Sequence, residues 1–429
     1  FILTDISFLF YSNHKHYWIV PKKFVEYGGK MRMERNEGQN RYGWAIVIGG
    51  LLLLMVFMGI VNNCYALFII PITESFHFTR SQYSVCQSLV FLFIMLSSAI
   101  SWKIYQRVGI LTAIRTAAVV LIVSYFCYSF AQSLPVFYLL SMIVGFCMGL
   151  TTTVAVPLLL SGWFQEKYGL ALGISLMGSG IGGTIFNPAA NMLIDLFNWQ
   201  RAYQILALIM AAVALPIVFF VFRVNKSNAE NMASNYDPSE EQPSEKSFLN
   251  RTAVSLLAII TIFAIVCTVL IYTITPYLQD IGYSAGVASF CASGSMAILA
   301  VGKLLEGWLL DHTSLKTCTY LAFASTAAGL IGLVLSKNPF MLLLVFLGVF
   351  LGCPYGTVAI PVAAGSICQR QADKRAAVGI FTAATNLGSA VSPALAGMVF
   401  DSFGSYSPLF ITSAVIVIAA MIPIKKIMK

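Results

Sequence analysis

The sequence predicts an all-α membrane protein in which twelve transmembrane helices form two six-helix bundles related by a parallel internal repeat. Hydrophobic residues make up 58% of the chain and charged residues only 10%, whereas soluble domains are about one-quarter charged. A helix needs about twenty apolar residues to cross the hydrocarbon core, and twelve such runs follow one another along the chain. Each run is expected to be helical, because backbone groups in lipid must be satisfied within the segment.

The apolar runs divide into two sets of six. The first set covers residues 42–70, 83–105, 110–131, 135–162, 168–194 and 202–223, and the second covers 253–276, 286–310, 317–336, 340–366, 376–400 and 407–425. Residues 225–252 between them are mostly polar, with several acidic side chains, and cannot bury enough apolar surface to offset their ordering entropy. We therefore assign residues 31–224 to an N-terminal bundle, 225–252 to a cytoplasmic linker and 253–429 to a C-terminal bundle.

An internal repeat supports this division. The stretch TVAVP, which ends at Pro157, returns as TVAIP, which ends at Pro361, about 205 residues later. Other pairs share this offset: Pro71 with Pro276, Gly173 with Gly379, Pro188 with Pro393, and DLFN at Asp195 with DSFG at Asp401. One ancestral half used twice in the same direction explains the shared offset. Pro157 and Pro361 are expected to kink helices 4 and 10, since proline lacks the backbone N–H.

The basic residues predict the orientation. Beyond residue 30, only Arg80, Arg201 and Lys337 lie on one side of the predicted topology, and all other Lys and Arg residues except Lys303, which lies within a span, are on the opposite side. Cytoplasmic loops carry the excess of positive charge, so both termini are expected in the cytoplasm of a protein of the cell (inner) membrane. The formal charge of +9 then reflects topology, and no nucleic-acid partner is expected.

The first thirty residues fit neither bundle. Gly28, Gly29 and Lys30 stand directly before Met31, and codons for this tripeptide can spell a purine-rich ribosome-binding site. We interpret residues 1–30 as an upstream leader translated in error, with initiation expected at Met31 or Met33.

Metal, cofactor and enzyme motifs are missing from the sequence. The nine cysteines are scattered without a CxxC pair, and His77 and His312, the two histidines beyond the leader, fall on opposite sides of the membrane. GxSxG, HExxH and GxxxxGK[ST] do not occur. We expect no metal, no cofactor and no enzymatic activity.

Two loop segments carry a family resemblance. Over residues 42–427 the chain resembles the major facilitator superfamily, whose loop signature is approximately GxxxDRxGR[RK]. The second copy here keeps Gly307, Asp311 and His312, while the first keeps Arg107 and Gly109 but has Trp102 and Gln106 where Gly and Asp would stand. The resemblance implies that these residues tie neighbouring helix ends together in one of two transport states.

A narrower resemblance lies between helices 4 and 5. SGWFQEKYGLALGISLMGSGIGG, residues 161–183, is similar to the pattern WFxxxRGLAxGxxxxGxxxG of the monocarboxylate porters and the oxalate/formate antiporter-like group. Gly169, Gly173, Gly178 and Gly182 form small-xxx-small pairs that let helices pack tightly. The alternative is that these glycines reflect only the general abundance of glycine in transmembrane helices.

Lys303 is the candidate binding residue. The resemblance implies that a basic residue of helix 8, four residues before the signature Gly307, meets the substrate carboxylate. Lys303 lies roughly 12 Å inside the membrane at about 1.5 Å per residue, and such a charge is a functional hypothesis by default. Glu306 follows on the same helix face, so the pair predicts either proton coupling or neutralisation within one helix, with snorkelling of Lys303 as a further alternative.

Departures from the family narrow the substrate. The oxalate transporters carry a second basic residue in helix 11, where this chain reads FTAATNLGSAVSP, and Asn62 stands where animal monocarboxylate porters have a helix 1 lysine. Two cations suit a dicarboxylate, whereas one suits a monocarboxylate or a zwitterion. Neutral polar residues within the spans form a second tier that either lines a central cavity or bonds across helices. They are Asn62, Asn63, Gln87, Asn187, Tyr272, Tyr355 and Asn386.

Together these features predict a secondary active transporter. We expect it to move a small, monocarboxylate-like organic anion by alternating access, as a monomer in the lipid bilayer, with H⁺ as a candidate coupling ion. A drug or amphiphile exporter of the same fold and a solute sensor that does not transport remain as alternatives.

Overall fold

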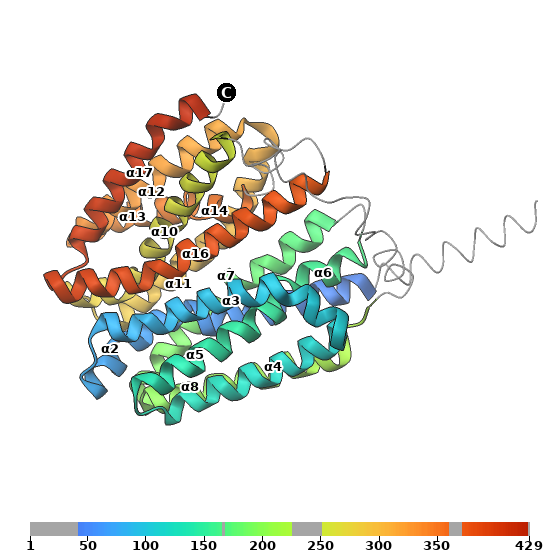
Figure 1. The fold of residues 1–429 in the computed structure, drawn as a ribbon. Helices are drawn as coiled ribbons and strands as arrows, with labels where there is room; N and C mark the ends of the chain where they lie inside the picture. Colours follow the sequence, from blue (N-terminus) through green and yellow to red (C-terminus); the bar gives the residue numbers. More distant parts are fainter. Residues whose placement is uncertain (1–41, 165–167, 225–250, 360–370, 428–429) are drawn as a thin grey trace, which may run out of the picture.

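The computed structural model describes residues 42–164, 168–224, 251–359 and 371–427, and regular structure within these ranges is helical throughout (Figure 1). The expected leader, residues 225–250 of the expected linker, and Pro361 lie outside the described residues. Of the expected linker, Arg251 and Thr252 are described, and they already belong to a helix.

Six spans form the N-terminal bundle. The first runs through residues 42–57, the π-helical η1 (Met58–Asn63) and α2 (Tyr65–Phe76). The others are α3 (Arg80–Val108); α4 (Ile110–Cys127) with η2 (Tyr128–Phe130); α5 (Leu134–Met148) with η3 (Gly149–Thr153) and α6 (Ala155–Ser161); α7 (Tyr168–Phe197); and α8 (Trp199–Pro216) with η4 (Ile217–Val221).

The C-terminal bundle repeats this order. Its elements are α10 (Arg251–Asp280), α11 (Ala285–His312), α12 (Leu315–Val334), η5 (Pro339–Met341) with α13 (Leu342–Leu351) and α14 (Tyr355–Val358), α16 (Gln371–Phe403) and α17 (Ser407–Ile427). Each of the twelve predicted spans thus has a described counterpart. Within the described ranges, nine helices are long and apolar enough to cross a membrane, and two shorter apolar helices accompany them.

The bundles have separate apolar cores. Phe68, Phe137 and Tyr203 are buried in the first, and Phe263 and Phe323, whose ring centroids are 4.3 Å apart, are buried in the second. We call the end where residues 42 and 427 lie the terminus side. The opposite end, where α2 turns into α3 and α10 into α11, is the far side.

Helix starts on the far side follow the repeat. Thr79 caps α3 by accepting a hydrogen bond from the backbone N–H of Gln82 at 3.2 Å, and Ser284 caps α11 by accepting one from Val287 at 3.3 Å. These hydroxyls satisfy N–H groups that have no partner in the first turn. Two residues about 205 positions apart therefore begin equivalent helices.

π-helical turns interrupt two spans of the first bundle and end a third, at η4. η1 contains both Asn62 and Asn63, and η3 ends at Thr153, four residues before Pro157 in α6. Because proline cannot donate to the residue four positions back, the change from α to π geometry falls next to the expected kink. Such turns are frequent at functional sites.

Glycines bring α7 against the first span. A Cβ on Gly182 would lie 2.9 Å from the Cα of Gly59 and would clash with the backbone carbonyl of Met55, and a Cβ on Gly178 would clash with the carbonyl of Leu51. Without a hydrophobic force between helices in lipid, this close backbone approach supplies the packing energy.

Gly182→Ala is therefore expected to lower the thermal stability of the purified protein. The backbone of Gly59 must shift to admit the methyl group, and overpacking of this kind costs about 1–3 kcal/mol. The melting temperature in detergent measures the effect. Gly286→Ala is the control, since its Cβ would meet nothing within 4 Å; equal melting temperatures for both variants would contradict the role of Gly182.

Candidate functional site

Lys303 lies at the interface of the two bundles. It projects from α11, is partly buried, and its Nζ donates to the Oγ of Ser179 on α7 at 3.4 Å. That bond is long and uses one of the three donors of an ammonium group. Lys303 therefore faces the other half of the protein with donors to spare.

Asn63 completes this group from a third element. Its Nδ2 donates to the backbone carbonyl of Ser179 at 2.7 Å, and it also lies against Gly183. The side chain comes from η1, whose π-turn changes the helix register just where Asn63 projects. Lys303, Ser179 and Asn63 thus bring α11, α7 and the first span together, and we call them the Lys303 site.

Glu306 does not pair with Lys303. Among the described residues the ion pair is not formed, although the two stand three residues apart in α11. Glu306 is 1% exposed, its Oε1 has no hydrogen-bond partner in the described part of the chain, and it interacts electrostatically with Tyr355 and Cys318 of its own bundle. Neutralisation of Lys303 within its helix therefore does not occur in this state.

From the Lys303 site toward the far side, α7 and α11 touch closely. A Cβ on Gly180 would lie 2.7 Å from the Cβ of Ala300, and one on Gly183 would lie 2.9 Å from the Cβ of Met296. Thr184 Oγ1 reaches the carbonyl oxygen of Ser293 at 3.4 Å. These contacts fix an antiparallel register between the two helices.

Toward the terminus side the same helices have room. A Cβ on Gly173 of α7 or on Gly307 of α11 would meet nothing within 4 Å. Gly173 lies seven residues before Gly180 on α7, and Gly307 lies seven residues after Ala300 on α11, so each is on the same helix face as a member of the touching pair. The tight packing expected at Gly173 is thus absent in this state, Gly307 also stands clear of its neighbours, and the two glycines occupy corresponding positions in the register.

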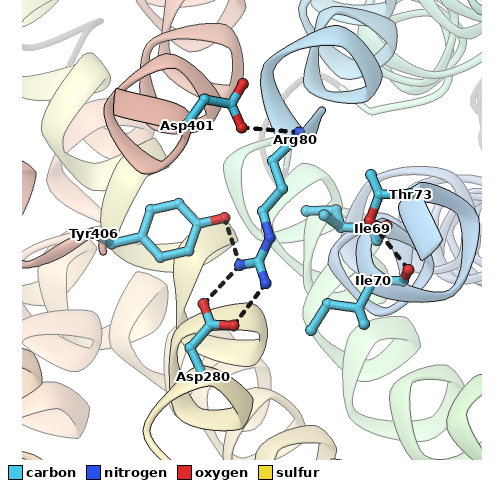
Figure 2. Close-up of polar contacts among 7 residues, drawn as sticks. All are labelled: Ile69, Ile70, Thr73, Arg80, Asp280, Asp401 and Tyr406. Atoms are coloured by element: carbon cyan, nitrogen blue, oxygen red, sulfur yellow. Dashed lines mark hydrogen bonds and ion pairs between the residues drawn. The ribbon is translucent and has the colours of Figure 1, made fainter. Parts of the chain in front are cut away.

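The far side is closed by one arginine. Arg80 forms a bidentate ion pair with Asp280, with both nitrogen–oxygen distances at 2.6 Å, and it donates to the hydroxyl of Tyr406 at 3.2 Å (Figure 2). Its guanidinium carbon lies 3.7 Å from the centroid of the Phe400 ring. This cluster, which we call the far-side clasp, joins α3 of one bundle to α10, α16 and the residue preceding α17 in the other.

Asp401 extends the far-side clasp to the backbone. Its carboxylate accepts from the N–H groups of Arg80 at 3.1 Å and of Ser81 at 2.9 Å, the first two residues of α3. An anion is stabilised at a helix N-terminus by these free donors and by the helix dipole. Burial alone would raise the pKa of Asp401, but the hydrogen bonds from Ser81 and Arg80 outweigh it and hold that pKa below its usual value.

Two of the expected cavity residues bond within the first bundle. Gln87 Nε2 donates to the Oδ1 of Asn62 at 3.2 Å, and both side chains are buried. Tyr355 is likewise internal to the second bundle, where its hydroxyl lies 2.6 Å from the Oγ1 of Thr319. Asn62, Gln87 and Tyr355 thus make hydrogen bonds between helices of one bundle, which was the alternative to lining a central cavity.

Other expected cavity residues lie elsewhere. Tyr272 of α10 stands at the bundle interface, with its ring 5.9 Å from Phe91 and 6.5 Å from Tyr65. Asn187 is 1% exposed, and neither of its side-chain polar atoms has a partner among the described residues. Asn386 is half-buried in α16.

The loop-signature residues lie on the terminus side. Arg107 is exposed in the last turn of α3, and Gly109 ends that helix with φ of 82°. His312 Nδ1 lies 2.8 Å from the carbonyl oxygen of Trp308. The side chain of Asp311 and the packing of Gly169 lie outside the described residues.

The sequence did not reveal Ser179 or the far-side clasp as site residues. Arg80 stood out only as one of three cations on its side of the predicted topology, and Asp401 only as part of the repeated DLFN and DSFG stretches. The partners of Arg80 in the far-side clasp lie 200 to 326 residues away in the chain, so no local spacing connects them.

Comparison with known proteins agrees with this architecture. The family model of the Major Facilitator Superfamily matches residues 51–376 and 257–427. In sequence, the chain is 28% identical to human monocarboxylate transporter 12 over 407 residues, covering 86% of this chain and 77% of that protein. It is 23% identical to rat monocarboxylate transporter 13, covering 88% and 87% of the two chains.

Solved structures show the same fold at lower identity. A variant of the nucleoside transporter NupG superposes with a TM-score of 0.72 at 12% identity, covering 90% of this chain and all of that one. A D-xylose-proton symporter superposes with a TM-score of 0.66 at 15% identity, covering 90% and 97%. These relatives are transporters and not enzymes, and the similarity to monocarboxylate porters read from residues 161–183 is confirmed over most of the chain. With its two six-helix halves and a family match across both, the protein belongs to the major facilitator superfamily.

Proposed function

We propose that the protein is a secondary active transporter of a small organic anion of the monocarboxylate type. The observation that carries this proposal is Lys303, a membrane-embedded cation that faces the opposite bundle and has no carboxylate partner among the described residues. A buried charge is stable only when paired or hydrogen-bonded, so an anion held between Lys303, Ser179 and Asn63 completes the site. The monocarboxylate transporters among the relatives support the same substrate class.

Alternating access follows from the two ends of the interface. The far-side clasp holds the bundles together at one end, while Gly173 and Gly307 stand clear at the other. Rocking of the two repeats about a central site exposes that site to each side in turn. We assign the terminus side to the cytoplasmic face of the cell membrane, on the distribution of basic residues, so the described state opens inward. We also propose that the protein works as a monomer.

Glu306 is the proposed proton carrier. It is buried one turn from Lys303 with an unpartnered oxygen in the described part of the chain, and intramembrane acids of this kind serve in proton relays. Because it does not pair with Lys303, the anion and the proton occupy neighbouring sites on α11 in this proposal. Tyr355, which interacts electrostatically with Glu306 and has its hydroxyl 2.6 Å from the Oγ1 of Thr319, is the proposed polar neighbour of the proton site.

Lys303→Ala should reduce uptake of labelled monocarboxylates into proteoliposomes by roughly tenfold or more, because hydrogen bonds to charged groups contribute about 1.5–3 kcal/mol. Lys303→Arg should retain part of the activity. Lys337→Ala, an exposed lysine on the far side, is the control and should transport normally.

The same assay separates the alternatives. Glu306→Gln should still exchange anions across the membrane but should lose stimulation by an inward proton gradient. Full monocarboxylate uptake by Lys303→Ala would contradict the anion site. Export of neutral amphiphiles that is independent of Lys303 would favour a drug exporter, and saturable binding without flux would favour a sensor.

Gly173→Leu and Gly307→Leu should trap the described state. In our proposal these two positions meet when the terminus side closes, so a bulky side chain there keeps the bundles apart while the described packing is undisturbed. The variants should keep the melting temperature and anion binding of the wild type but lose transport. Gly286→Leu, on the far side of α11, should transport normally; wild-type transport by Gly307→Leu would refute closure at this point.

Arg80→Gln should open the far side. It removes the bidentate bonds to Asp280 and the contact with Phe400, and even partly screened pairs of this kind shift a two-state equilibrium by about 1 kcal/mol. Spin labels incorporated at Phe130 and Phe340, both exposed on the far side, should report a larger population of long distances. Lys337→Gln is the control, and an unchanged distance distribution in Arg80→Gln would show that the far-side clasp does not hold the gate.

A further inference from the structure

A groove on the outer face of the N-terminal bundle has no role in the proposed transport. It has a volume of about 610 Å³, within the range of small-ligand pockets, about 300–1,000 Å³, and its walls are almost entirely apolar. Ile104 and Val108 of α3, Ala117 and Val120 of α4, and Met142 and Cys147 of α5 line it. We call it the α3–α5 groove.

The groove exists because the two halves differ at one helix pair. In the C-terminal bundle α12 and α13 pack along glycines, and a Cβ on Gly352 would lie 3.1 Å from the carbonyl oxygen of Ala322. The positions about 205 residues earlier are Cys147 and Ala117, and both border the groove. Cys147 has a side chain where its repeat counterpart, Gly352, has none. We infer that α4 and α5 are therefore held farther apart, which leaves the groove between them.

The groove faces the membrane and not the transport interface. α3 contacts the other bundle through Arg80, Ser81 and Ser88, whereas α4 and α5 make the outer side of their bundle (Figure 1). Val108 is 52% exposed and Val120 is 39% exposed. Water gains no hydrogen bonds from walls of this kind, so an apolar occupant from the bilayer is the suitable partner.

Two cations mark the terminus-side end of the groove. Lys103 and Arg107 are exposed in the last turns of α3, each next in sequence to a groove residue, Ile104 or Val108. Neither forms an ion pair within the described residues. The helix ends at Val108, so these charges stand at the depth where lipid headgroups lie. Basic side chains at the membrane ends of helices bind anionic headgroups in this way.

We propose that the α3–α5 groove binds an anionic membrane phospholipid, with one acyl chain between α4 and α5 and the headgroup phosphate against Lys103 and Arg107. The chain replaces the close helix contact that Gly352 and Ala322 make in the other half. The lipid therefore fills the N-terminal bundle on its outer face and leaves the Lys303 site free. This site is independent of the substrate that the protein transports.

Native mass spectrometry of the full-length protein, delipidated in detergent and titrated with phosphatidylglycerol or phosphatidylcholine, tests the proposal. The wild type should retain one phosphatidylglycerol more tightly than phosphatidylcholine, by roughly thirtyfold for two cations near one headgroup. Met142→Trp fills the groove and should abolish that retention. Leu347→Trp is the matched control, since Leu347 is the repeat counterpart of Met142 and is 41% exposed on α13, and it should bind phosphatidylglycerol as the wild type does.

A charge variant tests the headgroup contact. Lys103→Gln combined with Arg107→Gln should bind both lipids equally, because the acyl chain still fits while the cations are gone. Ala117→Leu, a smaller filling change, repeats the groove test if Met142→Trp is not monodisperse. Wild-type retention of phosphatidylglycerol in a folded groove-filling variant, or an undiminished preference for it in the charge variant, would overturn the proposal.

Discussion

The ion pair between Arg80 and Asp280 fixes the relation of the two bundles. Elsewhere in the described part of the interface the halves meet through small residues, weak polar contacts and the aromatic contacts of Tyr272, and lipid offers no hydrophobic force to press them together. A bidentate, charge-assisted pair adds both energy and direction. Because Asp401 binds the first N–H groups of α3, the same cluster also sets the position of α16 against the start of that helix.

A rigid far side determines what the rest of the interface can do. With the bundles fixed there, a rotation about that end changes the separation most at the terminus side, where α7 and α11 already part beyond Ser179 and Lys303. Gly397 illustrates the constraint, since a Cβ there would lie 2.5 Å from the Cα of Ser81. The far side is thus packed to backbone contact, and in the proposed alternating access its opening requires the contacts of the far-side clasp to be lost.

The spans and the repeat could be predicted because membrane thickness and backbone hydrogen bonding dictate them residue by residue. The structure extends the repeat to single helix caps, since Thr79 and Ser284 begin equivalent helices. The partner of Lys303 could not be predicted, since it depends on how α11 is rotated. Glu306, three residues on, is turned about 60° around the helix from Lys303. This rotation places Glu306 in the interior of its own bundle and Lys303 at the interface between the two bundles. The far-side clasp also escaped prediction, because Arg80 and Asp401 come from different halves and share no local pattern.

The repeat is therefore a guide to fold and a poor guide to function, because the residues to which we assign function lie where the halves differ. Asp195 and Asp401 stand at equivalent positions, yet Asp401 caps a helix of the other bundle while Asp195 accepts a hydrogen bond from Asn191 in its own helix at 2.9 Å. Lys303 has Ser98 as its counterpart, so only the C-terminal half places a cation at the interface. Two symmetric bundles would rock without preference for a ligand or a state. In the proposed mechanism, the unequal charges at equivalent positions provide an anion site in one half and an ion pair between the halves, as directional transport of an anion would require.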